Sequence, residues 1–380
     1  MGFCVQNRCR SVLSVDEDDN KSIFKNIFYS LSSHNDQFQQ TTNEGSTGSL
    51  LPKIMHRTWT DNLRFRSELL RNIRQFFYDR NFCEVQTPVL SADTVVDCYL
   101  DPLAVSEKSL PLNHHNTRKY YLQTSPEFAM KRLLAAGLDP IFQIVPVFRS
   151  GDRGHLHNVE FTMLEWYRIG DNYQTGMFLL AELIRFLFDA QEIELSGGQI
   201  GYCTYQDIFE SQVGLNPHTA TVQELQAICN DRRIAYPETN WTDSRDDWLD
   251  LLFVEVVQPV LEAVIVYDYP HTQAQLAKIR HDEEYPISER FELFLKGHEI
   301  ANGYHEIQDA VELRRRFQEN RERRLASGQS WLPINSRLLT VMELGFPPCS
   351  GTALGIDRLL MVMLDAETIE DVLTFPIETA

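Results

Sequence analysis

The sequence predicts an α+β fold in which an antiparallel sheet is flanked by helices. Two apolar, β-like runs, residues 141–148 and 159–168, enclose the polar loop RSGDRGHLHN, and this pattern is typical of a long-looped antiparallel hairpin. Residues 290–308 have the pattern of further antiparallel sheet. Helical periodicity follows the first pair of strands at 172–188 and the second at 309–327.

The first half of the chain begins with a segment of different composition. Residues 1–50 are rich in Ser, Asn, Gln, Thr and Asp and show neither a 3.6-residue nor a two-residue period, so we expect a flexible extension. From Asn62 onward an apolar face recurs at helical spacing, carried by Leu69, Leu70, Ile73, Phe76 and Phe77. A strand is expected at 82–89, ending at Pro88, because proline lacks the N–H that a ladder needs.

The second half continues the alternation of helices and strands. Residues 221–233 have a helical pattern, whereas residues 246–266 mix helix and strand signals and are left unassigned. Residues 349–355 lead into a helix at 357–364. No internal repeat is apparent.

Composition excludes several classes of protein. Of 380 residues, 35 are Lys or Arg and 54 are Asp or Glu, and the net charge of −19 disfavours nucleic acid and favours a basic partner. No run approaches the roughly 18 apolar residues that a membrane span needs, so no membrane association is expected. The seven cysteines contain no CxxC pair, and the first residues make a poor secretory signal. Cytoplasm is the compartment we expect.

Carboxylates occur at unusual places in the predicted strands. Strand alternation puts Glu165 and Tyr167 on an otherwise apolar face, so Glu165 either meets a cation in a cleft or ends at a solvated sheet edge. Both interpretations remain open on the pattern alone. Glu299 and Glu306 flank the step Asn302–Gly303, which we expect to bend the chain and leave both carboxylates at the surface.

Two arginines supply the complementary charge. Arg149 closes a strand, and Arg358 opens a helix after the run SGTALGIDR, where Gly351 and Gly355 permit a ligand to approach the backbone. The run is neither a P-loop nor GxGxxG, and no GxSxG elbow occurs. The pair His155 and His157 is a weak metal motif without partner ligands.

Taken together, these segments resemble a known family. The helix-strand unit ending at Pro88, the FR-loop-EFTMLEWY hairpin and the ALGIDR strand-helix resemble motifs one, two and three of the class II aminoacyl-tRNA synthetases. TSPE, EFTMLEWY and EIANGYHE resemble lysyl-tRNA synthetase. QTSPEFAMKRLLAAG, HNVEFTMLEWYR, EIANGYHEIQDA and PPCSGTALGIDR look still closer to the elongation factor P (R)-β-lysine ligases, over about residues 50–380.

The resemblance implies an architecture and a reaction. It implies one class II catalytic domain over residues 51–380, with a six-stranded antiparallel sheet, and a homodimer formed around Pro88. ATP and Mg²⁺ would serve to adenylate lysine or (R)-β-lysine, which then passes to a lysine ε-amine of elongation factor P.

The resemblance also implies roles for individual residues. Arg149 would hold the α-phosphate and Arg358 the γ-phosphate, and both would stabilise charge in the transition state. His157 and Gly355 belong near the nucleotide, and Asp152 stands one position after the usual motif two glutamate. The candidates for Mg²⁺ are Glu299 and Glu306.

The amino acid has its own set of residues in the family pattern. Glu165 and Tyr167 match positions that hold the side-chain ammonium. The other amino group would meet Ser125, Glu127 and Asn302. Ala353 stands where the synthetases have glycine, and one methyl shifts discrimination by roughly 1–3 kcal/mol.

Two other functions compete with protein ligation. One is a truncated synthetase paralogue that acts on tRNA or another acceptor, although only about fifty low-complexity residues precede motif one in place of an anticodon-binding barrel, so tRNA is an unlikely partner. The other is a non-catalytic paralogue that binds amino acid or nucleotide. Arg149 and Arg358 argue against the latter, because pure binding needs no phosphate clamp.

Overall fold

A computed structural model describes residues 58–106, 119–236, 244–281 and 284–380. The extension expected at residues 1–50 lies outside these residues. No described helix is both long and apolar enough to cross a membrane.

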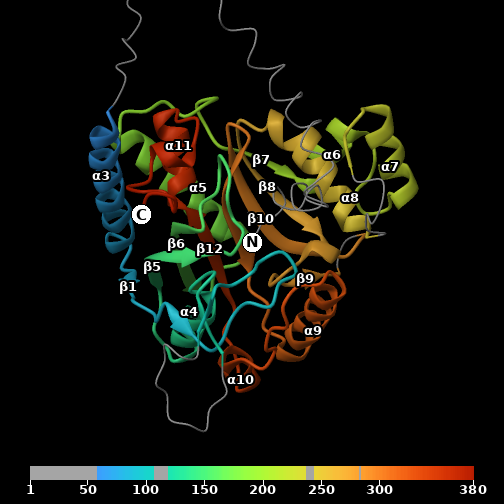
Figure 1. Cartoon of the computed structure of the whole chain (residues 1–380), viewed down its shortest axis with the longest axis horizontal. Coiled ribbons are helices and arrows are strands. Elements are labelled where there is room, and N and C mark those ends of the chain that lie inside the picture. Colours follow the sequence, from blue (N-terminus) through green and yellow to red (C-terminus); the bar gives the residue numbers. More distant parts are fainter. Residues whose placement is uncertain (1–57, 107–118, 237–243, 282–283) are drawn as a thin grey trace, which may run out of the picture.

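One large sheet organises the molecule (Figure 1). Its strands follow the order β1-β5-β6-β12-β11-β10-β8-β7, and β9 also pairs with β10. The six central strands pair antiparallel, as predicted, whereas β1 and β7 add parallel to the two sides. The strands of this sheet are β1 (Cys83–Glu84), β5 (Ile141–Phe148), β6 (Glu160–Ile169), β7 (Gly201–Thr204), β8 (Ala263–Pro270), β9 (Ile279–Arg280), β10 (Ile287–Leu295), β11 (His298–His305) and β12 (Cys349–Gly355).

Helices cover one face of this sheet and leave part of the other for a site. Leu164, Leu293 and Leu354 point to the covered face and join a core with α3 (Trp59–Tyr78), α5 (Tyr173–Ala190) and α11 (Ile356–Leu364). On the opposite face, α4 (Glu127–Ala135), α9 (Ala310–Ala326) and α10 (Arg337–Glu343) form a second core at one end. The predicted helices at 172–188 and 309–327 are confirmed.

The hairpin of β10 and β11 corrects one prediction. The chain turns at Lys296 and Gly297, both with positive φ, and Asn302–Gly303 lies inside β11 instead of at a bend. A Cβ on Gly303 would stand 2.2 Å from the Phe291 ring, so this glycine serves packing rather than a turn. Glu299 and Glu306 are consequently buried, at 6% and 1% exposure, and the expected surface position is wrong.

The region left unassigned at 246–266 changes conformation three times. Helix α8 (Arg245–Leu252) continues as a π-helical turn, Phe253–Val257, and a 3₁₀ turn, Gln258–Val260, before β8 begins. With α6 (Tyr205–Val213) and α7 (Val222–Asp231), where the helix predicted at 221–233 is confirmed, it forms a third core. The apolar residues of α8, Trp248, Leu249, Leu251 and Leu252, lie on one side of the helix and belong to this core.

The strand predicted at 82–89 is mostly wrong. Only Cys83–Glu84 pairs with the large sheet, in parallel with β5, and Pro88 lies in an irregular, exposed stretch. The chain then enters a small sheet of β2 (Leu90–Ser91), β4 (Tyr120–Leu122) and β3 (Ala104–Val105). Proline and the neighbouring polar residues end the ladder earlier than the β-formers alone indicate.

Candidate active site

The uncovered sheet face carries a polar pocket at its centre. In the strand register Glu165 on β6 stands opposite Ala353 on β12, and Ala353 stands opposite Asn302 on β11, so the three side chains share one row. Helix α4 and the residues before it close the pocket from above. The lining residues are Ser125, Glu127, Arg149, Met163, Glu165, Tyr167, Asn302, Tyr304, Glu306, Gly351, Thr352 and Ala353.

Glu165 is buried here, which decides between the two interpretations of its strand. Its side chain accepts hydrogen bonds from the Tyr167 hydroxyl at 2.6 Å and from Ser125 Oγ at 2.8 Å. Burial, followed by the charge of Glu127, raises the pKa of Glu165 to about 7. The solvated-edge interpretation is wrong, and the carboxylate lies where an incoming cation would stabilise it.

The other end of the pocket contains a buried ion triad. Lys131 Nζ lies 2.5 Å from Glu127 Oε1 and 2.5 Å from Glu306 Oε2, and all three side chains are less than 5% exposed. Burial lowers the pKa of Lys131, but the two carboxylates raise it by more, so the ammonium stays charged. Lys131 was not singled out from the sequence, although its i,i+4 spacing from Glu127 on an amphipathic helix was a usable signal.

Charge counting defines the ligand that fits. Three carboxylates, Glu127, Glu165 and Glu306, face two cationic groups, the Lys131 ammonium and the Arg149 guanidinium, which leaves one negative charge for a ligand to neutralise. Asn302 Oδ1 is buried and accepts no hydrogen bond within the described ranges, while its Nδ2 donates to the Tyr304 hydroxyl at 2.8 Å. A molecule with two ammonium groups and one carboxylate therefore suits both the net charge and the open acceptor.

Close packing fixes the floor of the pocket. A Cβ on Gly351 would stand 2.2 Å from the Tyr167 ring and 2.4 Å from Glu306 Oε1. Glycine at 351 therefore lets both functional side chains lie flat against the sheet. At position 353 the chain has a methyl group between Glu165 and Asn302 in the same row.

A second pocket adjoins the first along the strands. It is lined by Asp152, Leu156, His157, Asn158, Phe161, Gly355, Asp357, Arg358 and Ile369. Arg358 NH2 lies 2.6 Å from His157 Nε2, and its NH1 donates to the Glu299 carbonyl at 3.1 Å. Burial, with a contribution from Arg149, lowers the pKa of Arg358 to about 10. The buried Arg358 guanidinium, with Arg149 near enough to affect its pKa, suits an anionic ligand.

Arg149 connects the two pockets. It lines the first pocket, is only 1% exposed, and its guanidinium carbon lies 5.0 Å from the centre of the Phe161 ring, which lines the second. An anionic group bound to Arg149 would therefore lie between the two pockets, within reach of a ligand in either one.

The two carboxylates predicted for Mg²⁺ are not brought together. Seven residues of strand at about 3.3 Å each separate Glu299 from Glu306, and Glu306 is engaged by Lys131. Glu299 instead interacts with Glu292 of the neighbouring strand. Burial and then Glu292 raise the pKa of Glu299 to about 7.

Glu292 was not identified from the sequence as a candidate site residue. The only signal was that Glu292 and Arg290, two residues apart in a predicted strand, put two charged side chains on the same face. Glu299 Oε1 is buried and accepts no hydrogen bond from any described residue. Glu299 offers an open oxygen, and Glu292 lies near it while accepting from the Arg290 guanidinium and the Tyr269 hydroxyl. The two carboxylates could together hold a hard cation that keeps its remaining sites for phosphate and water. Among the described residues no three His, Cys, Asp or Glu gather as a metal site, so the His155–His157 motif has no support.

The structure thus groups most of the predicted residues. The whole amino-acid set, Ser125, Glu127, Glu165, Tyr167, Asn302 and Ala353, lines the first pocket. Of the residues predicted for the nucleotide, Asp152, His157, Gly355 and Arg358 line the second pocket, whereas Arg149 lines the first and Glu299 lines neither. Glu306 departs from its predicted place, since it belongs to the amino-acid pocket.

Comparison with known proteins agrees with this arrangement. The family described as tRNA synthetases class II (D, K and N) matches residues 51–379. Relatives named elongation factor P–(R)-β-lysine ligase occur in Pseudoalteromonas translucida and Haemophilus influenzae strain PittGG, each 40% identical over 84% of this chain and 96% of the relative. A relative of the same name from Salmonella arizonae is 38% identical over the same shares.

Proposed function

Because this chain belongs to the class II tRNA synthetase family of the D, K and N type, we propose that it is an ATP-dependent ligase. It adenylates (R)-β-lysine, or lysine, and transfers it to a lysine ε-amine of elongation factor P, the reaction after which its relatives are named. The observation that carries the proposal is a buried pocket with an excess of one negative charge, beside a second pocket that contains the Arg358 guanidinium.

The donor amino acid occupies the first pocket in this proposal. Glu165 and Tyr167 hold one ammonium group, and Glu127, Glu306 and Asn302 surround the other, so each positive charge replaces water with a buried carboxylate. The single carboxylate of the donor then faces Arg149. A neutral or acidic amino acid leaves at least one of these carboxylates without a partner and is rejected.

ATP occupies the second pocket, with its phosphates reaching toward Arg149. Phe161, His157 and Arg358 surround the nucleotide, and Asp152 lies beside them. Glu292 and Glu299 are the residues that hold Mg²⁺, which when bound neutralises phosphate charge. Glu306 is no longer a candidate ligand for the metal.

Activation is an in-line displacement. An oxygen of the donor carboxylate attacks the α-phosphorus, the bond to the β-phosphate bridging oxygen breaks, and pyrophosphate leaves. Arg149 meets the charge that develops on the α-phosphoryl oxygens, and Arg358 meets the charge of the far phosphates. No side chain forms a covalent bond in this step, so positioning and charge account for catalysis.

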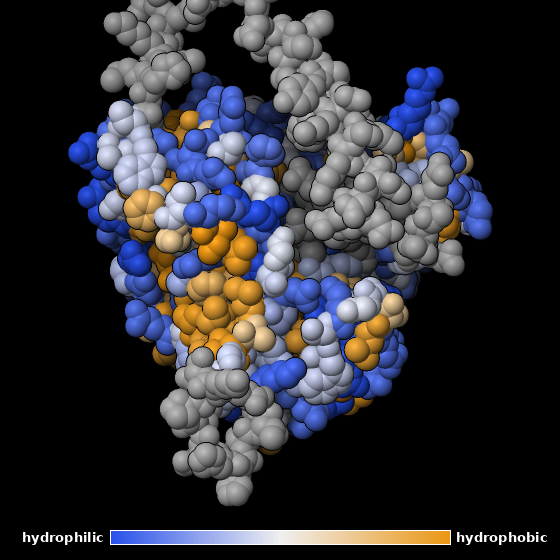
Figure 2. Space-filling view, in the orientation of Figure 1, coloured by the Kyte–Doolittle hydropathy of each residue, from blue (hydrophilic) through white to orange (hydrophobic). Residues whose placement is uncertain are grey.

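Assembly and location follow from the same proposal. We place a homodimer contact at the irregular stretch around Pro88, where Pro88 and Pro146 are exposed and Val89 and Phe148 are half-buried. Figure 2 shows an apolar area on this face of the molecule, over the region of β5 and β6. Residues 51–380 act as one catalytic domain, and a translation factor as acceptor places the enzyme in the cytoplasm.

The intact mass of elongation factor P tests the function directly. Purified factor is incubated with enzyme, ATP and Mg²⁺, with (R)-β-lysine and α-lysine in parallel and with tRNA as a competing acceptor. A gain of one lysyl unit on the protein that needs ATP and is larger with the β isomer is expected. Charged tRNA without modified protein would contradict the proposed acceptor, and absence of amino-acid-dependent pyrophosphate exchange would contradict the activity itself.

A further inference from the structure

The second pocket, which takes ATP in the proposed function, has a carboxylate in its wall that an anionic ligand does not favour. Asp152, Asp357 and Arg358 line this pocket, and these three side chains sum to one negative charge. The Asp357 side chain is only 2% exposed. A buried carboxylate in the wall repels phosphate oxygens unless a cation behind the wall compensates its charge.

The compensating cation is Arg66 of α3, which does not itself line the pocket. Its NH1 lies 2.5 Å from Asp357 Oδ1, and its NH2 donates to Thr162 Oγ1 at 2.6 Å. The second carboxylate oxygen, Asp357 Oδ2, accepts from the Thr162 backbone N–H at 2.6 Å. Among the described residues, Arg66 is the one cation within ion-pair distance of Asp357.

Arg66 thereby joins α3 to β6 and to the first turn of α11, which lies beside α3 in Figure 1. Asp357 directly precedes Arg358 in the chain, and Thr162 directly follows Phe161. Arg358 and Phe161 both line the pocket. The guanidinium is therefore fixed one residue behind two parts of the nucleotide wall, where its rigid fork of donors meets a carboxylate and a hydroxyl together.

The same face of α3 also holds the outer wall of the pocket. Trp59, Asn62 and Arg66 follow one another at i, i+3 and i+7, and each donates a side-chain hydrogen bond to the segment 371–373. The acceptors are the carbonyls of Asp371, Val372 and Leu373. Just before this segment, Ile369 lines the pocket, and its N–H donates to the His155 carbonyl at 2.7 Å.

We propose that Arg66 is a positioning residue for ATP. It neutralises Asp357 and fixes that carboxylate against β6, so the positive charge of Arg358 and Arg149 is left for the phosphates. Arg66 acts through Asp357 and does not touch the nucleotide. The inference rests on the proposed function, which assigns the second pocket to ATP, and it adds to that site a residue that lines neither pocket.

Two variants separate the charge of Arg66 from its shape. Arg66→Met leaves Asp357 charged, whereas Arg66→Met with Asp357→Asn removes both charges and keeps an oxygen for the Thr162 N–H. In pyrophosphate exchange, we expect KM for ATP to rise about tenfold in the single variant and to return to within about threefold of its original value in the double variant. KM for the donor amino acid should stay level in both, because the donor lies in the other pocket.

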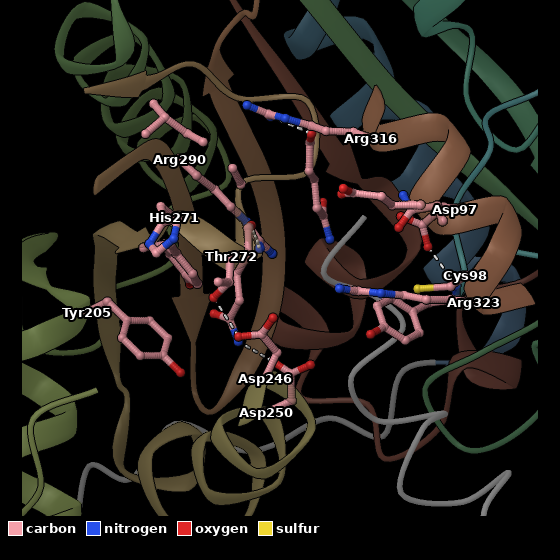
Figure 3. A pocket seen from close by; sticks show the side chains of 18 of the residues that line it. Asp97, Cys98, Tyr205, Asp246, Asp250, His271, Thr272, Arg290, Arg316 and Arg323 are labelled. Carbon is pink, nitrogen blue, oxygen red and sulfur yellow. Dashed lines mark hydrogen bonds between the residues drawn. The ribbon is translucent and has the colours of Figure 1, made fainter. Parts of the chain in front are cut away.

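Matched controls remove an arginine elsewhere. Arg64 lies two residues away on α3, is 79% exposed and pairs with Asp61, so Arg64→Met should leave KM for ATP unchanged. Arg323 is exposed on α9 and lines a separate cavity of about 310 Å³ (Figure 3). This cavity shares no lining residue with the nucleotide pocket, so Arg323→Met should also leave KM for ATP unchanged.

Calorimetric titration with ATP, after thermal unfolding has shown which variants are folded, gives the same comparison without turnover. Unchanged ATP affinity in Arg66→Met overturns the inference, and so does a double variant that binds ATP as weakly as the single one. If either variant does not fold, Arg66→Lys keeps the charge and supplies the test: a KM for ATP near the original value supports the inference, and a tenfold rise overturns it. Failure of the unsubstituted enzyme both to bind ATP and to catalyse exchange overturns the proposed function instead.

Discussion

Lys131 Nζ lies 2.5 Å from Glu306 Oε2, which ties helix α4 to the end of strand β11 beside the amino-acid pocket. The same ammonium contacts Glu127, so one lysine serves two carboxylates that also belong to the binding pocket. Its charge therefore sets how much positive charge the pocket still accepts.

Replacing this lysine tests that relationship. Lys131→Met should destabilise the protein by roughly 3–5 kcal/mol at pH 8, since it leaves buried carboxylates without their partner. The deficit should shrink toward pH 6. The orphaned carboxylates then have folded-state pKa values above their unfolded values, so the native state gains protons, and stability, as pH falls.

The measurement is urea unfolding of the two proteins across this pH range. Lys296→Met is the matched control, because Lys296 pairs with Asp365 in an exposed ion pair and should change stability by less than about 1 kcal/mol. A deficit that stays constant from pH 6 to pH 8 would show that lost packing, not lost charge, dominates.

Glu165 should govern donor binding through its protonation. With the pKa of Glu165 near 7 in the empty pocket, kcat/KM for the donor should fall as pH drops below 7, by at most tenfold per pH unit, while KM for ATP stays level. Glu165→Gln should abolish activation and leave ATP binding intact. Pyrophosphate exchange between pH 6 and 8.5 measures both.

The same substitution should stabilise the empty protein above pH 7. The folded-state pKa of Glu165 lies above its unfolded value, so the ionised carboxylate weakens the fold as pH rises between the two. We expect Glu165→Gln to gain stability of order 1–3 kcal/mol at pH 8. Glu160→Gln, exposed on the same strand, should change neither activity nor stability. Normal activation by the Glu165 variant would remove the basis for the donor assignment.

Local pattern predicted the strands and helices that carry the site, and its failures have physical causes. The hairpin of β5 and β6 and the face of β6 on which Glu165 lies follow from side-chain period, whereas the burial of Glu165 in a pocket does not. Asn302–Gly303 looked like a turn because the dipeptide is common there, but the Phe291 ring is what requires a glycine.

The roles of some site residues depend on tertiary contacts and could not be predicted from the local sequence pattern. Glu306 and Glu299 share a strand and a residue type, and only the contact with Lys131 in one case and Glu292 in the other separates their roles. Lys131 lies 175 residues before its partner Glu306 in the sequence. Glu292 lies on β10, the strand next to the one that carries Glu299. Their positions depend on the sheet register, which no single segment encodes.

The Mg²⁺ requirement of the enzyme should distinguish Glu292 and Glu299 from Glu306. Glu299→Gln and Glu292→Gln should each raise the Mg²⁺ concentration needed for half-maximal exchange by about 10- to 100-fold, since each removes a hard oxygen ligand. Glu306→Gln should leave that concentration unchanged and instead raise KM for the amino acid. A Mg²⁺ titration at saturating donor distinguishes them, and a shift in metal requirement for the Glu306 variant would restore the assignment made from the sequence.

The methyl group of Ala353 should set the choice between donor isomers. It lies in the same row as Glu165 and Asn302, so it limits how far the donor sinks between the two ends of the pocket. Ala353→Gly enlarges the floor and should move the ratio of kcat/KM for α-lysine over (R)-β-lysine upward by about 10-fold, within the 1–3 kcal/mol that one buried methyl contributes. Thermal unfolding and KM for ATP are measured in parallel, because Ala353 packs against the small core of Val145, Val147 and Met163, against which Phe161 of the nucleotide pocket also packs. An unchanged ratio would assign the preference to the placement of the carboxylates, since they then hold both isomers at equal depth.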